Sequence, residues 1–182
     1  MIIDRYEAVP EDLESRLWPL YEAAFRDVDT LAAQRHLLDR AEFAAILADK
    51  RIATFVARDD VGPAGVAVMT NVLEAWPLVS PRFFARRWPD HYRRGAVWYF
   101  GFVAVDPVWA GRGYVFAQLI AAMQPTVGRH GIAVMDFCAY NSQVRGLPAA
   151  SGAVLRRIDP QARLEQVDVQ EFWAVRFDGT AP

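Results

Sequence analysis

The chain has 182 residues, of which 53% are hydrophobic and 23% charged, and its formal net charge is −2. This composition is that of an ordinary folded protein, and the length predicts a single domain over residues 1–182. Because the charges are so nearly balanced, there is no basic excess to attract nucleic acid or an anionic membrane, and neither is expected as a partner.

The cysteine and histidine content and the first residues bear on disulfides, metal sites and the cellular compartment. Cys138 is the only cysteine, so the chain cannot form an intrachain disulfide or a cysteine-rich metal site. The three histidines are scattered, and no metal is expected. Asp4 and Glu7 stand where a signal peptide would need an apolar core, and no apolar run has membrane-spanning length. We therefore expect a cytoplasmic protein.

The first part of the chain is predicted to form a strand, helices and a hairpin. Apolar residues recur at helical spacing after Pro10, and again after Thr30. Two β-branched runs then flank a loop that contains glycine and proline, which is typical of a hairpin. The expected elements are a strand at 2–8, a helix at 10–25, a helix at 31–47 that is split near Asp39, and strands at 52–57 and 65–70.

The next stretch, residues 71–96, is irregular in pattern and rich in aromatic rings and arginine. A connection of this length inside a compact domain is usually functional or partly helical. We considered a substrate lid and an oligomer contact for it, and the sequence does not choose between them.

The middle of the chain combines an apolar run, a turn with two glycines, and a helix. Residues 97–105 are apolar throughout, which predicts a strand covered on both faces. After Asp106-Pro107, Gly111 and Gly113 lie in a turn that leads into an apolar helix beginning at Tyr114. The first backbone N–H groups of such a helix have no partner within the helix. The stretch therefore predicts a binding site for phosphate groups.

The C-terminal part is predicted to return to the sheet. A strand at 132–140 is expected to lie parallel to strand 97–105, because a helix is the usual crossover between parallel neighbours. A short helix is expected from Asn141, with Gly152 as its cap. Further strands are expected at 154–158 and at either 164–169 or 172–177, followed by a frayed tail at 178–182.

The residues around the glycine turn favour one class of phosphate ligand. A dinucleotide fingerprint requires a third glycine, but its position is occupied by Phe116. A nucleoside triphosphate loop requires Lys-Ser or Lys-Thr after its last glycine, and the chain has neither there. What is left is a ligand whose pyrophosphate binds a short loop at the start of a helix.

Three groups of residues stand out within this order of elements: Val103-Ala104-Val105-Asp106-Pro107, the loop Ala110–Val115, and Asn141 with Leu147 and Gly152. Together with the order of elements, they resemble the GNAT acyltransferase superfamily. The resemblance implies an α/β (α+β) fold with a mixed, mostly antiparallel sheet, a parallel pair at its centre, and helices on both faces. It also implies acetyl-CoA as cosubstrate. The implied cofactor-binding residues are Val103, Ala104, Val105, Ala110, Gly111, Arg112, Gly113, Tyr114, Val115 and Asn141.

Four positions differ from the pattern of that family. Ala110 replaces an arginine or glutamine, and Val115 replaces a small residue, which is expected to place an isopropyl group where the backbone of that family approaches the pyrophosphate. The family's usual acid, a tyrosine, corresponds to Pro148, and its usual base, a glutamate, corresponds to Gly101. Substitutes stand nearby: Tyr140 and Ser142 for protonating the thiolate, and Glu74, Tyr99 and Asp136 for accepting a proton through water.

The sequence thus supports an N-acyltransferase that moves an acetyl group from acetyl-CoA to an amine of a small molecule or protein by direct attack in a ternary complex. A non-catalytic GNAT-like binding or regulatory domain is the alternative, and side chains such as Trp98, Phe102 or Phe137 in the gap between the parallel strands would favour it. A longer acyl chain and a homodimer were also considered, because of the aromatic stretch and the apolar last strands.

Overall fold

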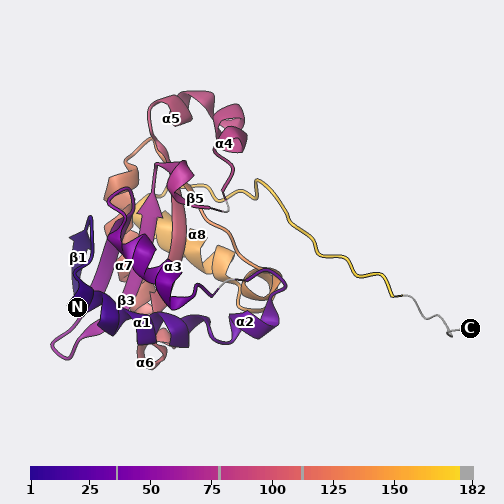
Figure 1. The fold of residues 1–182 in the computed structure, drawn as a ribbon. Coiled ribbons are helices and arrows are strands. Elements are labelled where there is room, and N and C mark those ends of the chain that lie inside the picture. The colour runs from indigo at the N-terminus through magenta and orange to yellow at the C-terminus, as the bar shows by residue number, and fades with distance from the viewer. Residues whose placement is uncertain (36, 78, 112, 177–182) are drawn as a thin grey trace, which may run out of the picture.

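The computed structural model describes residues 1–35, 37–77, 79–111 and 113–176. The expectations about His36, Arg112 and residues 177–182 therefore concern residues outside this set. Five strands form one sheet in the order β1-β2-β3-β4-β5, antiparallel except for the last pair, which is parallel (Figure 1). The strands are β1 (Ile2–Tyr6), β2 (Ala53–Arg58), β3 (Pro63–Thr70), β4 (Val97–Val105) and β5 (Ile132–Val134).

Helices connect the strands and cover the sheet. Residues 71–96 contain one 3₁₀ turn and two short helices, as the partly helical prediction for this stretch required. The helices are α1 (Glu11–Phe25), α2 (Val28–Leu31), α3 (Arg40–Ala48), η1 (Leu73–Ala75), α4 (Pro81–Arg87), α5 (Pro89–Arg93), α6 (Pro107–Ala110), α7 (Tyr114–Val127), the π-helical turn η2 (Tyr140–Val144) and α8 (Leu147–Ile158).

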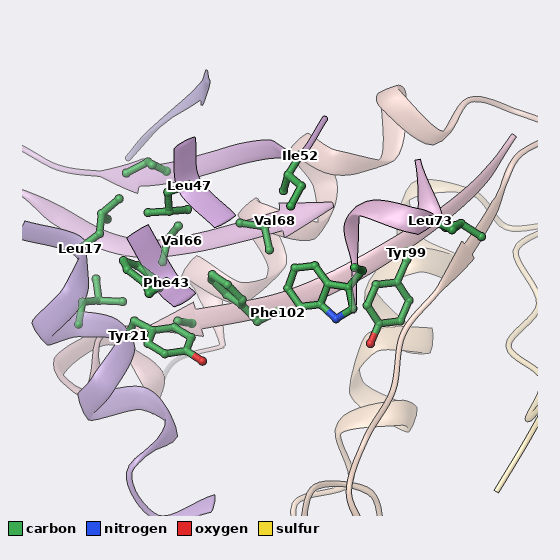
Figure 2. Close-up of a cluster of buried hydrophobic side chains, with 14 of the residues drawn as sticks. Leu17, Tyr21, Phe43, Leu47, Ile52, Val66, Val68, Leu73, Tyr99 and Phe102 are labelled. Carbon is green, nitrogen blue, oxygen red and sulfur yellow. The ribbon is translucent and has the colours of Figure 1, made fainter. Parts of the chain in front are cut away.

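One face of the sheet packs against α1 and α3. Tyr21 of α1 lies with its ring 4.7 Å from that of Phe43 on α3 and 4.9 Å from that of Phe102 on β4. Figure 2 shows these rings next to the strand residues of the same cluster. Buried aromatic rings bring large apolar areas out of water, so this cluster fixes both helices on the sheet. Its other buried members include Leu17, Leu20, Leu47, Ile52, Val56, Val66 and Val68.

The opposite face packs against α7, with α8 behind it. Val115 and Leu119 of α7 are fully buried and approach Gly65 of β3, where a Cβ atom would lie 2.9 Å from Val115 and 3.1 Å from Leu119. The absence of a side chain at Gly65 therefore allows α7 to lie close to the sheet. Other buried members of this cluster are Phe55, Ala57, Ala67, Met69, Phe100, Ile120 and Met123.

These two clusters confirm the predicted fold class, an α+β protein with a mixed sheet and helices on both faces. They also explain why strands β2 to β4 are apolar at nearly every position, since successive side chains point to opposite covered faces. The parallel pair β4-β5 lies at one edge of the sheet rather than at its centre, because no later strand is added to β5 in the described part of the chain.

Three predicted strands differ from the structure. The strand expected at 132–140 is only three residues long, and the chain then leaves the ladder. The strand expected at 154–158 is wrong: these residues continue α8, which places Val154 and Leu155 against the α7 cluster. The last predicted strand, at 164–169 or 172–177, is also absent, since described residues 163–176 are extended but unpaired.

The predicted helix at 31–47 is shorter than expected. Residues 32–39 separate α2 from α3, and the split near Asp39 is confirmed. The Asp39 side chain accepts the N–H of Glu42, while the Glu42 side chain accepts the N–H of Asp39. This capping box satisfies backbone groups at the start of α3 and so determines where the helix begins.

Candidate functional site

The parallel strands β4 and β5 separate soon after they meet. Pairing joins Val97, Trp98 and Tyr99 to Ile132, Ala133 and Val134, and β4 then continues to Val105 alone on that side within the described residues. A strand edge of this kind presents unpaired N–H and C=O groups. The edge of β4 over residues 100–105 can therefore bind an extended ligand through its backbone.

The same edge leads directly into the predicted phosphate loop. The Asp106 side chain accepts the N–H of Val108 at 2.9 Å and so begins the short helix α6. Gly113 then begins α7 with φ of 61°, a left-handed conformation that favours glycine, and no side chain caps the helix. Apart from the neighbours of each glycine in the chain, no described residue lies within 4 Å of the positions where Gly111 and Gly113 would carry a Cβ atom. The space beside the start of α7 is thus open among these residues, which would allow an anion to approach its first N–H groups.

Val115 does not obstruct this loop, although its isopropyl group was expected to. Its side chain is fully buried against Gly65 and Leu119, on the side of α7 that faces the sheet. Its backbone N–H is one of the first N–H groups of α7, which have no partner within the helix. Ala110 and Tyr114, by contrast, are exposed. Because alanine stands at position 110 instead of arginine or glutamine, the loop surface has no long polar side chain at that position.

Asn141 carries an unsatisfied polar atom. It lies in η2, and its Oδ1 atom is buried without a hydrogen-bond partner among the described residues. A buried acceptor without a donor costs free energy until a donor reaches it. An amide N–H of a bound ligand would satisfy it, so this residue fits the role that the resemblance implies.

Tyr99 and Asp136 meet across the point where the strands separate. The buried Tyr99 hydroxyl donates a hydrogen bond to Asp136 Oδ1, two residues beyond the end of β5. Burial, together with the negative charge of Asp136, raises the pKa of Tyr99 well above its ordinary value. Tyr99 is therefore a fixed hydrogen-bond donor at neutral pH, and Asp136 is an exposed carboxylate held in place by it.

Trp76 is a residue of this region that the sequence prediction missed. Its ring lies 5.6 Å from that of Tyr99, and its atoms would come within 2.2 to 2.7 Å of a Cβ atom at Gly101. The β3-β4 register shifts between Val68 and Met69, opposite Gly101. A glycine inside an apolar strand signals a bulge or a close approach, and that signal could have identified the contact.

The other predicted catalytic residues lie apart from this pair. Glu74, in η1, accepts a hydrogen bond from the Tyr92 hydroxyl of α5 at 3.1 Å, which raises the pKa of Tyr92. Tyr140 lies half-buried in η2 beside Asn141, and the Ser142 hydroxyl donates to the carbonyl oxygen of Ala139. No hydrogen bond in the described ranges joins Glu74 to Tyr99 or Asp136.

The aromatic residues that would favour the non-catalytic alternative by filling the gap mostly pack elsewhere. Phe102 belongs to the cluster under α1 and α3, where its ring contacts those of Tyr21 and Phe43. Trp98 packs against the α7 cluster. Phe137 lies half-buried on the segment that follows β5. Two of these three side chains are thus turned toward the faces of the sheet.

Two surface cavities lie away from the site. One, of about 200 Å³, is bordered by Arg16 and the β2-β3 loop, and the other, of about 180 Å³, by Arg5, Lys50 and Trp98. An open strand edge and a helix N-terminus bind through backbone groups at the surface, so the site does not require an enclosed cavity.

Two further observations concern ions and membranes. Among the residues that the structure describes, no three His, Cys, Asp or Glu side chains are grouped so that they could hold a metal ion. Within the same residues, every helix is too short or too polar to cross a membrane.

Solved structures share this arrangement over nearly the whole chain. An aminoglycoside acetyltransferase from an uncultured soil metagenomic sample, in complex with sisomicin, matches with a TM-score of 0.53 and 17% identity, over 96% of both chains. The protein has the GNAT acetyltransferase fold. AAC(6')-Iy, bound to a CoA-S-monomethyl-acetylneamine bisubstrate analogue, matches with a TM-score of 0.53 and 18% identity over 96% of this chain and 100% of its own.

A protein acetyltransferase has the same GNAT fold. The ribosomal-protein-S18-alanine N-acetyltransferase of Escherichia coli matches with a TM-score of 0.51 and 13% identity, over 83% of this chain and 77% of its own. At these identities the likeness concerns the fold alone. No protein-family model matches the sequence, and no curated protein matches it either.

Proposed function

We propose that this protein is an N-acetyltransferase that transfers the acetyl group of acetyl-CoA to an amine. One observation carries the proposal: the open edge of β4 is followed, after the short helix α6, by an uncapped, glycine-bearing helix start. Such a path offers backbone groups for an extended amide-containing chain and then N–H groups for a pyrophosphate. Coenzyme A has these two parts in this order.

Different residues along this path would bind different parts of coenzyme A. The backbone of Val103, Ala104 and Val105 would hold the pantetheine arm, and Asn141 Oδ1 would accept one of its amide N–H groups. Within the loop from Ala110 through Val115, the N–H groups of Ala110 and Gly113 already donate to the carbonyl oxygens of Asp106 and Ala110. The pyrophosphate would therefore be held by the N–H groups of the first residues of α7, Tyr114 and Val115. Arg112 belongs to the same loop, outside the described residues. Glycine at 111 and 113 leaves the loop surface open for close approach.

Asp136 is the group we assign to the acceptor amine. Bound acetyl-CoA supplies a thioester, whose C–S bond breaks as the amine nitrogen forms the new C–N bond. The amine must give up a proton, and the exposed carboxylate of Asp136, oriented by the Tyr99 hydroxyl, receives it directly or through water. We assign the protonation of the departing thiolate to Tyr140, which lies beside Asn141 in η2.

The acceptor is proposed to be a small-molecule or protein amine, in keeping with the aminoglycoside and ribosomal-protein substrates that the names of the compared enzymes give. An amine that arrives as an ammonium ion would be attracted to the carboxylates of Asp136 and Glu74. We propose that the reaction takes place in the cytoplasm, since a chain with a single cysteine suits reducing conditions.

Calorimetric titration with acetyl-CoA and a thiol-release assay over a panel of amines test this proposal. We expect binding, followed by thiol release with at least one amine. Asp136→Asn should bind acetyl-CoA as before but turn over about 10²–10⁴-fold more slowly, the usual contribution of general acid–base catalysis. Asp90→Asn, an exposed change in α5, is the matched control. Absence of acetyl-CoA binding would reject the proposal.

A second candidate is a GNAT-fold domain that binds a ligand without catalysis. The contact of Trp76 with Gly101 favours it, because the bulge in β4 has no room for a catalytic side chain at that position. This candidate predicts acetyl-CoA binding without thiol release from any amine, and with equal affinity in the Asp136→Asn variant.

A further inference from the structure

Helices α4 and α5 stand together at one end of the molecule, on the connection between β3 and β4 (Figure 1). Their inner side is fixed by apolar contacts: Phe84 is buried, and Trp88 and Tyr92 pack against the cluster to which it belongs. The Tyr92 hydroxyl also donates a hydrogen bond to Glu74 of η1. The outer side of this helix pair is therefore held in a defined position.

The helix pair concentrates positive charge. Residues 81–94 contain five arginines and one acidic residue, Asp90, in a chain whose formal net charge is −2. All five arginine side chains are exposed, and two of them, Arg87 and Arg93, have ion-pair partners. A surface that carries unpaired cations so close together attracts anions. The arginines of this stretch that form no ion pair within the described ranges are Arg82, Arg86 and Arg94.

Two of these arginines are unfavourable for α4 itself. Arg82 lies in the first turn, where the partial positive charge of a helix start favours acidic side chains, and this turn has none. Arg86 follows four residues later, and like charges at this spacing lower the stability of a helix. Helix stability therefore does not account for the pair, whereas binding of an anion does.

An aromatic ring lies beside these two cations. Phe83 is 37% exposed, because the side chains that α4 directs inward are Phe84 and, one turn later, Trp88. Positions 82, 83 and 86 fall on one side of the helix, and we call Arg82, Phe83 and Arg86 the α4 patch. Each guanidinium can bind a carboxylate through two parallel hydrogen bonds, and the ring adds apolar contact. The α4 patch thus fits the acidic and apolar side chains of a polypeptide.

The chain itself places an extended acidic segment against α4. Glu165, in the extended segment 163–176, pairs with Arg87 at 3.4 Å. A single exposed pair contributes little, so a partner must engage several arginines at once.

The small size of the α4 patch favours a polypeptide over a nucleic acid. It extends for about 6 Å along the helix, a length that a few residues of extended chain cover. Nucleic acids bind through longer series of phosphates, and the remainder of this chain has more acidic than basic residues, which would repel them.

We propose that the α4 patch docks an acidic segment of the protein whose amine is acetylated. This assignment rests on the proposed function, and it narrows the acceptor from any amine to an amine of an acidic protein. The patch belongs to the same connection, residues 71–96, as Trp76, whose ring lies 5.6 Å from that of Tyr99. A protein docked there is held on the part of the molecule that continues into the site.

Fluorescence anisotropy with labelled probes tests the docking without acetyl-CoA. The probes are a glutamate-rich peptide, the same peptide with glutamine in place of glutamate, and a single-stranded RNA of equal charge. We expect binding of the glutamate peptide, weakened about tenfold or more by Arg82→Glu and by Arg86→Glu. Arg16→Glu, the same change at an exposed arginine of α1, is the matched control and should bind as the wild type does. Equal binding of the glutamine peptide, tighter binding of the RNA, or unaltered affinity in Arg82→Glu would overturn the docking.

Thermal unfolding separates docking from a structural role of Arg82. Arg82→Glu places an acidic residue in the first turn and four residues before Arg86, so its Tm should equal or exceed that of the wild type while it binds the peptide less well. A lower Tm together with weaker binding would assign Arg82 to stability instead.

Acetyl transfer to the two peptides, each with a free N-terminal amine, tests the choice of acceptor. The glutamate peptide should have the lower KM, and Arg82→Glu should remove this difference without changing turnover of a small amine. Equal KM values for both peptides in the wild type would reject an acidic protein as the acceptor. Absence of thiol release from any amine would instead reject the proposed function, and the anisotropy measurements would still decide the docking.

Discussion

Gly101 lies where any side chain would collide with an indole ring. A Cβ atom there would be 2.2 Å from Trp76 Cη2, and the ring is held among Tyr99 and Phe102. We predict that Gly101→Ala lowers the free energy of unfolding by about 1–3 kcal/mol, the usual cost of overpacking. Urea denaturation measures it.

A double-mutant cycle identifies the cause of that loss. In a Trp76→Ala background the indole is gone, so Gly101→Ala should cost much less than in the wild type. Equal costs in both backgrounds would show that the ring is not responsible.

Tyr21 makes the free energy of unfolding depend on pH in the alkaline range. Burial raises its pKa from 10.0 to about 12, while its oxygen accepts the N–H of Leu38. The folded state thus holds a proton that the unfolded chain loses near pH 10. This contribution is complete below pH 10 and disappears as the pH rises toward 12, a loss of about 3 kcal/mol for two pKa units.

Urea denaturation between pH 9 and 12 tests this dependence. The free energy of unfolding should fall more steeply with pH in the wild type than in Tyr21→Phe. Phe25→Leu, which alters a ring packed 4.9 Å from Tyr21, should change stability without changing the slope. A Tyr21→Phe slope equal to that of the wild type would contradict the assignment.

At the scale of residues, the sequence predicted where the loop glycines lie better than it predicted the directions in which side chains point. Gly111 and Gly113 were expected in an open turn before a helix, and they lie there. Val115 was expected to crowd the same turn, but it points into the core, because the side of α7 that faces the sheet depends on packing with β3. The approach of Trp76 to Gly101 joins distant parts of the chain and required the folded structure.

At the scale of elements, two glycines before α7 have different roles. Gly113 is needed for the backbone conformation, and Gly111 leaves room for a ligand. Gly113 has φ of 61°, whereas Gly111 has φ of −66° and free space around it. Gly113→Ala should therefore cost about 1–2 kcal/mol of stability for the left-handed conformation. Gly111→Ala should leave stability unchanged but weaken acetyl-CoA binding, if the pyrophosphate approaches the backbone there.

Thermal unfolding and calorimetry on these two variants check the prediction. Val108→Ala, a change on an exposed residue of the neighbouring helix α6, serves as the control for binding. Unaltered acetyl-CoA affinity in Gly111→Ala would remove the loop from the proposed site.

The elements predicted correctly have strong local signals. The hairpin strands, the run at 97–105, the helix start at Pro10 and the split near Asp39 are examples. The prediction of a strand at 154–158 depends on Gly152 being the end of a helix. In the structure Gly152 lies inside α8, where the missing side chain makes room for Leu164. A glycine that ends a helix and one that permits a contact look alike in a sequence.

At the scale of the whole molecule, hydrogen exchange should follow the order of the sheet. Amides of β2, β3 and the paired part of β4 are enclosed by both clusters and should exchange most slowly. Amides of residues 166–175, for which no backbone hydrogen bond is found among the described residues, should exchange at once. Mass spectrometry of peptides measures this order, and slow exchange in residues 166–175 would contradict it.

The contact between Gly65 and Val115 makes sequence changes in the sheet depend on sequence changes at the start of α7. Since the loop is positioned from beneath by this contact, its exposed residues can change during evolution without moving the helix start. The two contacting positions cannot change independently: a side chain at 65 would require a smaller one at 115. Among related sequences, we expect residues 65 and 115 to vary together, and position 110 to vary alone.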